Sequence, residues 1–370
     1  MRLVAKLADF FNGVIQLLPN HVIIKLYSIG RSYFMSYYYK NNTHRYINAA
    51  TSLQPRVLWG LKFNLPLMNS AGMFKNGEGY DIVCRQGAGG YLGGTSTYNP
   101  RTGNIINGVK LPFVKLLKSG ITINCLGLPN LGDEVLSRQK IITDGKRCPI
   151  GWSLMRSPDY NEEESLQKLL QSLWLYHDNL QIDFLEINES CPNVKVIINE
   201  VSNVNHAVDS LAKRLIYIGE NFLAQRKRQL PVIVKLSVDI DYEYLKTILN
   251  ILFKYKFDGI NLGNTSVDYT NIRLNIVNSE LKLFDYFVNN FKGGVGGYAL
   301  KQKSLDLCKC AVDYRNMVNP DYEFHVLRSG GIDSINDIYA SDRVGVSMNQ
   351  WYSGYFTNYI KYGDMLYVKF

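Results

Sequence analysis

Residues 187–193 hold the densest group of side chains that could do chemistry, in the order Ile-Asn-Glu-Ser-Cys-Pro-Asn. An Asn side chain offers one carbonyl acceptor and two amide donors, so Asn188 and Asn193 could together recognise the edge of a uracil-like ring. Cys191 lies between them, and a thiol with an ordinary pKa of about 8.5 becomes a general base after modest tuning. The competing interpretation is a buried cysteine in a turn before proline.

Lys235 lies inside the apolar run 232–237, and an unpaired lysine in such a strand would be costly to bury. The lysine therefore needs a partner. A cofactor that carries negative charge is one candidate, and a buried ion pair is the other.

Three glycine-containing stretches occur in the last third of the chain: 293–297, 329–331 and 352–354. Bare backbone N–H groups at loop–helix junctions bind phosphate oxygens, so together these stretches predict a phosphate site. They match neither GxGxxG after a first strand nor GxxxxGK[ST], which disfavours a Rossmann dinucleotide site and a P-loop.

Eight short apolar runs are typical of buried parallel strands, and most are separated by amphipathic helical patterns. The runs cover 65–70, 90–95, 149–155, 183–188, 231–236, 259–262, 324–328 and 344–350, and the clearest helices cover 162–177, 206–225, 242–255 and 300–313. This alternation predicts a (β/α)8 TIM barrel, with an insertion in 97–147. The polar residues above follow the predicted strands, where such barrels carry their active sites.

Residues 1–52 predict a small N-terminal helical extension ahead of a barrel domain that covers 53–370. Apolar residues recur at helical spacing over 3–18 and again over 21–39, with Lys6, Lys25, Arg31 and Lys40 on a basic side. One interpretation is a hairpin packed on the barrel. The other is a membrane-associating hairpin with its apolar face in the lipid.

Composition limits the remaining possibilities. The 370 residues are 46% hydrophobic, which excludes wholesale disorder, and no uninterrupted apolar run is long enough for a membrane span. The formal charge of +9 suits an anionic substrate, a phosphate-bearing cofactor or an anionic membrane, whereas no motif or basic block indicates nucleic acid. The six cysteines lack zinc spacing and a secreted disulfide pattern, so we expect no metal site and a reducing compartment.

From Pro55 to the C-terminus, the order of these motifs resembles the dihydroorotate dehydrogenases, FMN-containing (β/α)8 barrels of pyrimidine synthesis. The matching stretches are 70–78, 94–95, 124–130, 188–193, Lys235, 264–265, 296–297, 330–331 and 352–353. The resemblance implies that Cys191 removes a proton from C5 of dihydroorotate while a hydride passes from C6 to flavin N5. It implies that Lys235 stabilises negative charge on the reduced flavin.

The same resemblance assigns the binding residues. The substrate would be bound by Lys75, Asn124, Leu126, Gly127, Leu128, Asn188, Asn193, Asn264 and Thr265. FMN would be bound by Ala71, Gly72, Lys75, Thr95, Ser153, Asn188, Lys235, Gly296, Gly297, Gly330, Gly331, Tyr352 and Ser353.

The sequence mixes features of the two main branches of that family. The N-terminal extension and the stretches 75–78 and 293–304 are similar to the membrane-associated, quinone-reducing branch. Cys191 and 127–130 are similar to the soluble branch, whose base is cysteine and whose acceptor is fumarate or NAD. Glu189 replaces a usually small or apolar residue, Ser153 replaces a frequent Asn, and 194–198 lacks the usual Pro-Gly turn.

The interpretation that we favour is oxidation of dihydroorotate with electrons passed to a quinone, at the cytoplasmic side of the inner membrane as a peripheral protein. One alternative keeps the chemistry but uses fumarate or NAD, in the soluble cytoplasm. Another is a barrel that binds flavin without turnover, suggested by the altered loop after Asn193.

Overall fold

The computed structural model describes residues 14–15, 17–40, 47, 52–142, 145–146, 148–189 and 204–370, without the side chains of 204–209. Its centre is an eight-stranded parallel sheet in the order β3-β15-β14-β12-β11-β10-β9-β4. Parallel bridges from Met68 of β3 to Gly90, just before β4, and from Phe74 in the loop after β3 to Gly93 of β4 close the barrel. The strands are β3 (Leu67–Asn69), β4 (Tyr91–Ser96), β9 (Ile150–Leu154), β10 (Phe184–Asn188), β11 (Val232–Ser237), β12 (Gly259–Gly263), β14 (His325–Ser329) and β15 (Met348–Trp351).

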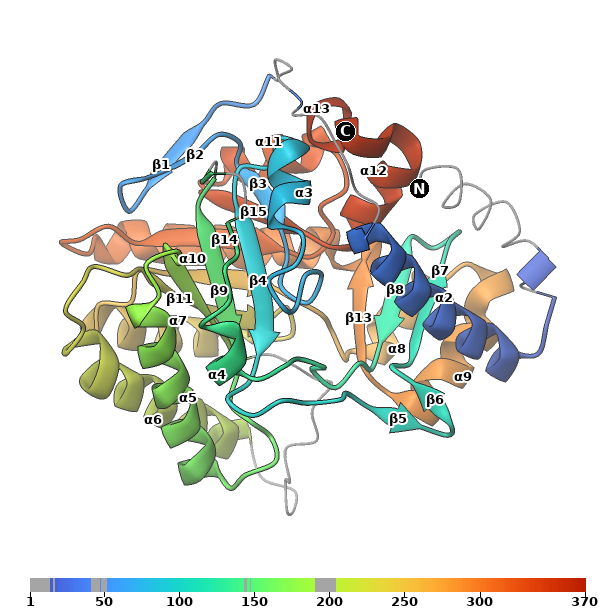
Figure 1. Cartoon of the computed structure of the whole chain (residues 1–370), viewed down its shortest axis with the longest axis horizontal. Coiled ribbons are helices and arrows are strands. Elements are labelled where there is room, and N and C mark those ends of the chain that lie inside the picture. Colours follow the sequence, from blue (N-terminus) through green and yellow to red (C-terminus); the bar gives the residue numbers. More distant parts are fainter. Residues whose placement is uncertain are drawn as a thin grey trace.

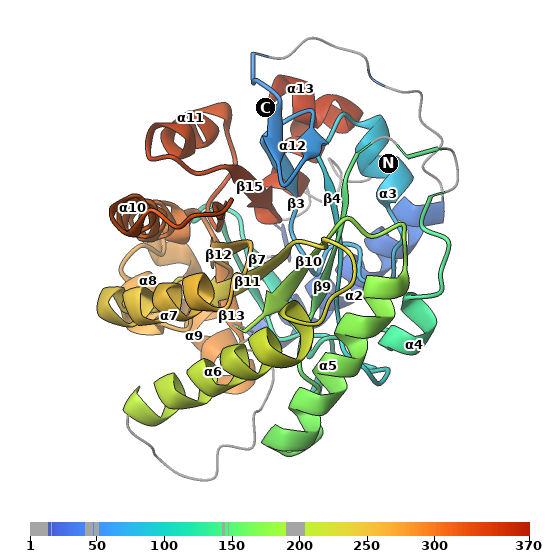
Figure 2. The ribbon, with the colours of Figure 1, turned by 90° about the vertical axis from the view of Figure 1, so that its left-hand side faces the viewer.

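Helices surround this barrel, as Figure 2 shows for α5, α6, α7, α10 and α11. Between consecutive barrel strands lie α3 (Tyr80–Arg85), α4 (Asp133–Leu136), α5 (Glu162–Asp178), α6 (Val204–Ile218, extended by the π-helix Gly219–Leu223), α7 (Tyr242–Lys254), α8 (Tyr269–Arg273), α9 (Leu281–Phe291), α10 (Lys301–Val318) and α11 (Ile335–Arg343). The chain ends in α12 (Ser353–Tyr362) and α13 (Leu366–Lys369), and 3-10 turns lie at Asn278–Glu280, Tyr298–Leu300 and Gly363–Met365. The predicted barrel and all eight predicted strands are confirmed.

Side-chain caps fix where two of these helices begin after their strands. The Asn161 side chain accepts a hydrogen bond from the Glu164 amide (2.9 Å) ahead of α5. Asp241 does the same for the Tyr244 amide (2.9 Å) ahead of α7. Each cap satisfies a backbone N–H that has no partner within its helix.

The last strand, β15, begins at Met348, four residues later than the predicted run 344–350. The reason is that α11 extends to Arg343 and is followed by a turn at Gly345, whose φ is +83°.

The predicted insertion in 97–147 contains small strands beside the barrel. These are the hairpin β5 (Ile105–Ile106) and β6 (Val109–Lys110), and then β7 (Phe113–Leu116) and β8 (Ile121–Asn124). The strand β13 (Gly294–Gly297) pairs antiparallel with β8, and so forms a three-stranded sheet in the order β13-β8-β7. A separate hairpin, β1 (Arg56–Leu58) and β2 (Leu61–Phe63), precedes the barrel.

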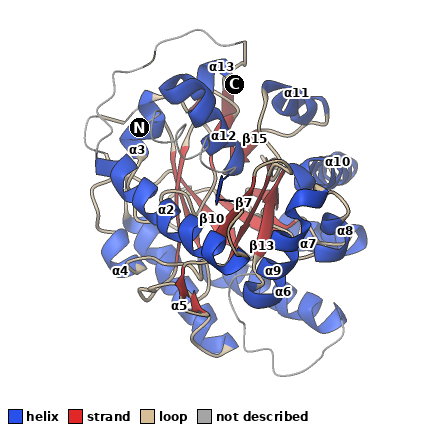
Figure 3. Ribbon diagram, turned by 90° about the vertical axis from the view of Figure 1, so that its right-hand side faces the viewer, coloured by secondary structure: helices blue, strands red, loops and turns tan. Residues whose placement is uncertain are grey.

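One N-terminal helix, α2 (Asn20–Lys40), lies against this small sheet, as Figures 1 and 3 show. Its Ser28 hydroxyl accepts a hydrogen bond from the Phe113 amide of β7 (3.0 Å). Further along α2, Tyr38 hydrogen-bonds Tyr355 of α12 (2.6 Å). The second predicted helix is therefore present and packed on the barrel. Most of the first predicted helix lies outside the described residues.

Candidate active site

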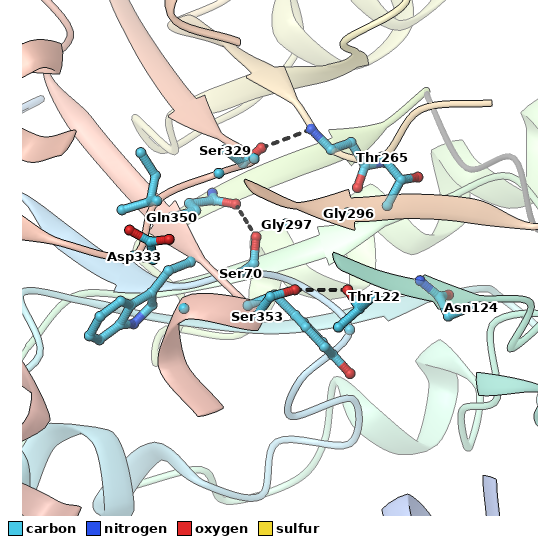
Figure 4. A pocket seen from close by; sticks show the side chains of 18 of the residues that line it. Ser70, Thr122, Asn124, Thr265, Gly296, Gly297, Ser329, Asp333, Gln350 and Ser353 are labelled. Carbon is cyan, nitrogen blue, oxygen red and sulfur yellow. Dashed lines mark hydrogen bonds between the residues drawn. The ribbon is translucent and has the colours of Figure 1, made fainter. Parts of the chain in front are cut away.

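A cavity of about 540 Å³ opens at the carboxyl ends of the barrel strands. Residues that end or follow β3, β4, β10, β12, β14 and β15 line it, together with β8 and β13 of the small sheet. Figure 4 shows Thr122 and Asn124 of β8 on one side, with Ser329 and Gln350 of the barrel on another. Active sites of (β/α)8 barrels lie on this face.

Most of the site residues predicted from the sequence line this cavity. They are Ala71, Gly72, Lys75, Thr95, Asn124, Leu126, Leu128, Asn188, Asn264, Thr265, Gly296, Gly297, Gly330, Gly331, Tyr352 and Ser353. Gly127 lies in the loop after β8, where its carbonyl accepts a hydrogen bond from Arg101 Nε (3.1 Å). Cys191 and Asn193 lie outside the described residues, so their roles stay predictions.

A layer of buried polar side chains fills the barrel directly beneath the cavity. Lys235 Nζ lies 3.7 Å from Glu186 Oε1 and donates to Gln350 Oε1 (3.2 Å). The other carboxylate oxygen, Glu186 Oε2, accepts from Gln350 Nε2 (2.7 Å) and Asn261 Nδ2 (2.8 Å). Ser153 Oγ donates to Glu186 Oε1 (3.2 Å). The Glu186 carboxylate has no exposed area, and these donors compensate the cost of burying its charge. The ion pair therefore has a fixed geometry.

Two short chains of hydrogen bonds connect this layer to the cavity wall. Gln350 lines the cavity and accepts a hydrogen bond from Ser70 Oγ (3.2 Å, Figure 4). Thr95 also lines the cavity, and its hydroxyl lies 2.9 Å from Ser153 Oγ and 3.1 Å from Asn188 Nδ2. The structure thus contains the buried ion pair considered for Lys235. Direct contact of Lys235 with a cofactor stays a prediction.

One end of the cavity is built from glycine loops and the first turns of helices. Gly330 and Gly331 precede α11, and Ser353 begins α12. The Gly331 φ is +79°, and a Cβ there would lie 2.4 Å from the Lys301 Cα, so only glycine fits. The Ser353 hydroxyl lies 2.8 Å from that of Thr122. Converging helix N-termini and backbone N–H groups suit an anion, above all phosphate.

Amide side chains gather toward the small sheet. Asn124 ends β8, Asn188 ends β10, and Asn264 follows β12. Asn264 has a φ of +45°, a left-handed conformation that asparagine tolerates, whereas Leu128 has a φ of +56°, which is unfavourable for a leucine. Such strain commonly occurs where a side chain must be aimed at a ligand. Lys75 adds a cation to the same cavity.

The structure adds site residues that the sequence prediction missed, namely Glu186 and Gln350 in the polar layer and Lys115 and Thr122 in the cavity wall. Lys235 is predicted as a site residue because it is a charged residue within an apolar strand. Glu186 gives the same signal on the neighbouring strand, within Phe-Leu-Glu-Ile. Lys115 and Thr122 lie in the insertion, where nothing in the sequence indicates the pairing with β13.

A second cavity, of about 260 Å³, lies between α2 and the active-site loops, and Gly72 and Lys75 line both cavities. Arg31, predicted on the basic side of the hairpin, turns inward and donates to the Tyr352 hydroxyl (2.9 Å). Tyr39 donates to the Met73 carbonyl (2.9 Å), and burial raises the pKa of nearby Glu78 above its usual value. α2 thus contacts the site at two places, through Arg31 at Tyr352 and through Tyr39 at the Met73 carbonyl.

Asp133 is a fully buried carboxylate behind β4. It accepts hydrogen bonds from the hydroxyls of Ser96, Ser172 (2.6 Å) and Tyr176 (3.1 Å). Burial raises its pKa to about 6, because desolvation outweighs these three hydrogen bonds. Ser96 adjoins Thr95 in the cavity wall, so this carboxylate supports the strand that carries Thr95.

Within the residues that the structure describes, no helix combines the length and hydropathy needed to cross a bilayer. The described side chains also contain no group of three or more His, Cys, Asp or Glu placed to hold a metal ion.

Comparison with known proteins identifies the family of this chain. The family model described as dihydroorotate dehydrogenase matches residues 53–365. A dihydroorotate dehydrogenase (quinone) of Buchnera aphidicola is 27% identical over 301 residues, which cover 80% of this chain and 80% of that protein. Another of that name, from Stenotrophomonas maltophilia, is 24% identical over 318 residues and covers 85% and 83%.

Solved structures agree on the fold. The Eimeria tenella DHODH in complex with ferulenol has a TM-score of 0.71 at 19% identity and covers 91% of this chain and 88% of that one. The ligand-free structure from the same organism has a TM-score of 0.70 at 21% identity, over 90% of each chain. The family match extends over most of the sequence, including every barrel strand: this chain belongs to the dihydroorotate dehydrogenase family.

Proposed function

We propose that this chain oxidises dihydroorotate to orotate in pyrimidine synthesis, with FMN as cofactor and a membrane quinone as the final electron acceptor. The observation that carries the proposal is the single cavity in which three Asn side chains and Lys75 lie opposite a glycine-lined anion site. The family membership and the names of the relatives support the same activity.

The cavity fits FMN in volume and in chemistry. Its 540 Å³ lies within the usual range for small-molecule sites. At Gly72, which lines it, a Cβ would meet no atom within 4 Å, so the wall is open for a ring. Gly330, Gly331 and Ser353 would hold the phosphate, and Thr95 would contact the ring. When bound, FMN supplies the two-electron acceptor that takes a hydride.

The amide side chains suit the substrate. Dihydroorotate has alternating N–H and C=O groups along its ring and one carboxylate. Asn124, Asn188 and Asn264 offer both donors and acceptors to that edge, and Lys75 offers a positive charge. Oxidation removes a proton from C5 and a hydride from C6, which leaves a C5=C6 double bond. We assign the proton acceptor to Cys191, three residues after Asn188.

The outward face of α2 supports peripheral membrane association. Leu26, Ile29, Tyr33 and Tyr37 recur at helical spacing and are 43%, 58%, 68% and 39% exposed. An apolar stripe of this kind inserts at the lipid interface. The cavity beneath α2 adjoins Lys75, and so offers a quinone a route from the membrane to the flavin site.

The first experiment mixes purified full-length protein with dihydroorotate in the absence of oxygen and follows the flavin absorbance. The wild type should bleach, whereas Cys191→Ala should bind FMN but reduce it at least about 100-fold more slowly. Parallel assays supply a soluble quinone, fumarate or NAD, and turnover should require the quinone. A wild-type flavin that stays oxidised would refute the proposed activity, and turnover with fumarate or NAD alone would refute the acceptor.

The second experiment tests the α2 stripe with anionic vesicles. Ile29→Asp should lower co-sedimentation by about tenfold or more, because it exchanges an exposed apolar contact for a charge. Ser32→Asp adds the same charge beside the stripe and should lower binding much less. Equal losses in both variants would mean that charge alone, and not the stripe, governs association.

A further inference from the structure

Arg328 is a fully buried arginine directly behind the glycine-lined end of the cavity. Its neighbours in β14, Leu327 and Ser329, face the barrel interior, so the Arg328 side chain points outward, between the barrel and its helices. There the guanidinium donates to the Lys301 carbonyl (2.6 Å), Ser304 Oγ (3.0 Å), Ser341 Oγ (2.9 Å) and the Asp337 carbonyl (3.3 Å).

These bonds tie the beginning of one helix to the body of another. Lys301 and Ser304 lie in the first turn of α10, whereas Asp337 and Ser341 lie in α11. The Ser304 hydroxyl that accepts from Arg328 also donates to the Gly330 carbonyl (2.8 Å). One guanidinium therefore sets the position of α10, α11 and the Gly330–Gly331 loop, the parts that build the anion site.

Arg328 also balances charge at this end of the cavity. Asp337 is the nearest carboxylate to act on Arg328, and Asp333, which lines the cavity, lies beside Asp337. Lys301 Nζ pairs with both, at 2.9 Å and 3.1 Å. Burial lowers the pKa of Arg328, but an arginine begins so far above neutrality that it stays charged. Lys301 is already shared between these two carboxylates, so Arg328 supplies a further positive charge beside Asp337, close to where a dianionic phosphate must bind.

We propose that Arg328 is a positioning residue that makes this site selective for a phosphorylated flavin. It orders the backbone donors for the phosphate, and its buried charge offsets that of Asp337. The inference rests on the proposed function, because it takes FMN to be the ligand. It predicts a role in recognising the phosphate and none in recognising the isoalloxazine ring.

The experiment compares dissociation constants of FMN and riboflavin, which lacks the phosphate, for full-length flavin-free protein by flavin fluorescence. Arg328→Gln should weaken FMN binding about 30-fold or more and riboflavin binding less than about threefold, because the backbone donors that bind the charged phosphate lose the side chain that orders them. Arg328→Lys keeps the charge but lacks the planar guanidinium. Its dissociation constant for FMN should lie between those of Arg328→Gln and the wild type.

Arg228 provides a matched control. It donates to four backbone carbonyls, those of His177, Ile182, Tyr176 and Asn179, away from the cavity. Arg228→Gln should lower stability while the ratio of FMN to riboflavin affinity stays at its wild-type value. If Arg328→Gln fails to fold, Ser304→Ala removes the hydroxyl between Arg328 and Gly330 and should weaken FMN binding alone, by about threefold.

The outcomes separate this inference from the proposed function. A wild type that binds FMN and oxidises dihydroorotate, with variants that keep its preference for FMN over riboflavin, would overturn the role of Arg328 alone. A wild type that binds neither flavin would overturn both the proposed function and the role of Arg328. The role of Arg328 would be supported if Arg328→Gln or Ser304→Ala lost affinity for FMN but not for riboflavin, and if Arg228→Gln showed no such loss.

Discussion

The barrel interior contains two layers of opposite character, only two residues apart along the same strands. The lower layer is apolar: Met68, Leu92, Phe184, Ile233, Leu327 and Met348 pack against Trp59 and Phe63 of the β1–β2 hairpin. The upper layer is polar and carries Glu186, Lys235, Asn261 and Gln350. On β10 the change occurs from Phe184 to Glu186, and on β11 from Ile233 to Lys235.

This difference separates stability from chemistry within one set of strands. Side chains at i and i+2 point to the same face of a strand, so β10, β11 and β15 each supply one residue to each layer. The lower residues exclude water and fill space. The upper residues hold a charge pair beneath the cavity, where charge changes during the proposed reaction. Substitutions in the two layers should therefore have different kinetic and thermodynamic signatures.

The largest effect is expected for Lys235→Met. The change leaves Glu186 buried without its cation, and should lower the free energy of unfolding by about 3–5 kcal/mol. Flavin reduction by dihydroorotate should slow at least about 100-fold, because a fixed charge behind the site is lost. Denaturant unfolding and anaerobic stopped-flow absorbance measure the two effects.

The double variant Glu186→Gln with Lys235→Met distinguishes charge balance from catalysis. Removing both charges should restore much of the stability, since a buried ion pair adds little net stability over neutral side chains. Flavin reduction should stay slow. Recovery of the rate in the double variant would mean that Lys235 acts only by neutralising Glu186.

A smaller effect is expected at Asp133, a buried carboxylate that has hydroxyl partners and, in the described part of the chain, no paired cation. Its pKa of about 6 exceeds the 3.8 of an exposed aspartate, so the folded state binds the proton more tightly. The resulting stabilisation is complete below the unfolded pKa and is lost as pH rises through 6.

Asp133→Asn does not titrate at this position and provides the reference. From pH 7 to pH 5 the wild type should gain about 1–2 kcal/mol relative to Asp133→Asn in urea unfolding of the full-length protein. A difference that stays constant over this range would show that burial does not raise the pKa of Asp133 in the folded protein.

Much of the architecture could be predicted from the sequence because the signals are local. Each barrel strand is an apolar run of a few residues, and the polar residues that follow it mark the face with the site. Lys235 was recognisable as a charge within such a run. Glu186 gives the same local signal, but its pairing with Lys235 is diagonal, because the register of β10 against β11 places Glu186 opposite Ile233 and Asn188 opposite Lys235.

The features that escaped prediction depend on contacts between distant segments. Thr122 of β8 lies opposite Gly296 of β13 and also contacts Ser353 of α12, across 231 residues of sequence. The periodicity of the sequence predicts that Arg31 lies on the basic face of a helix. It does not predict the partner of Arg31, the Tyr352 hydroxyl, which belongs to the loop after the last barrel strand. A hydrophobic period gives the face of a helix, whereas the neighbour of that face is set by packing of the whole chain.

The smallest effect is expected for Ile233→Val, the lower-layer partner of Lys235 on β11. Ile233 has no exposed area, and loss of one methyl group should cost about 0.5–1.5 kcal/mol of unfolding free energy. The rate of flavin reduction and the FMN dissociation constant should equal those of the wild type, because the residue reaches neither the ion pair nor the cavity. A rate change of tenfold or more, about 1.4 kcal/mol in the barrier, would mean that packing in the lower layer sets the geometry of the upper one. The two layers would then act as one unit, and the separation of stability from chemistry along each strand would be wrong.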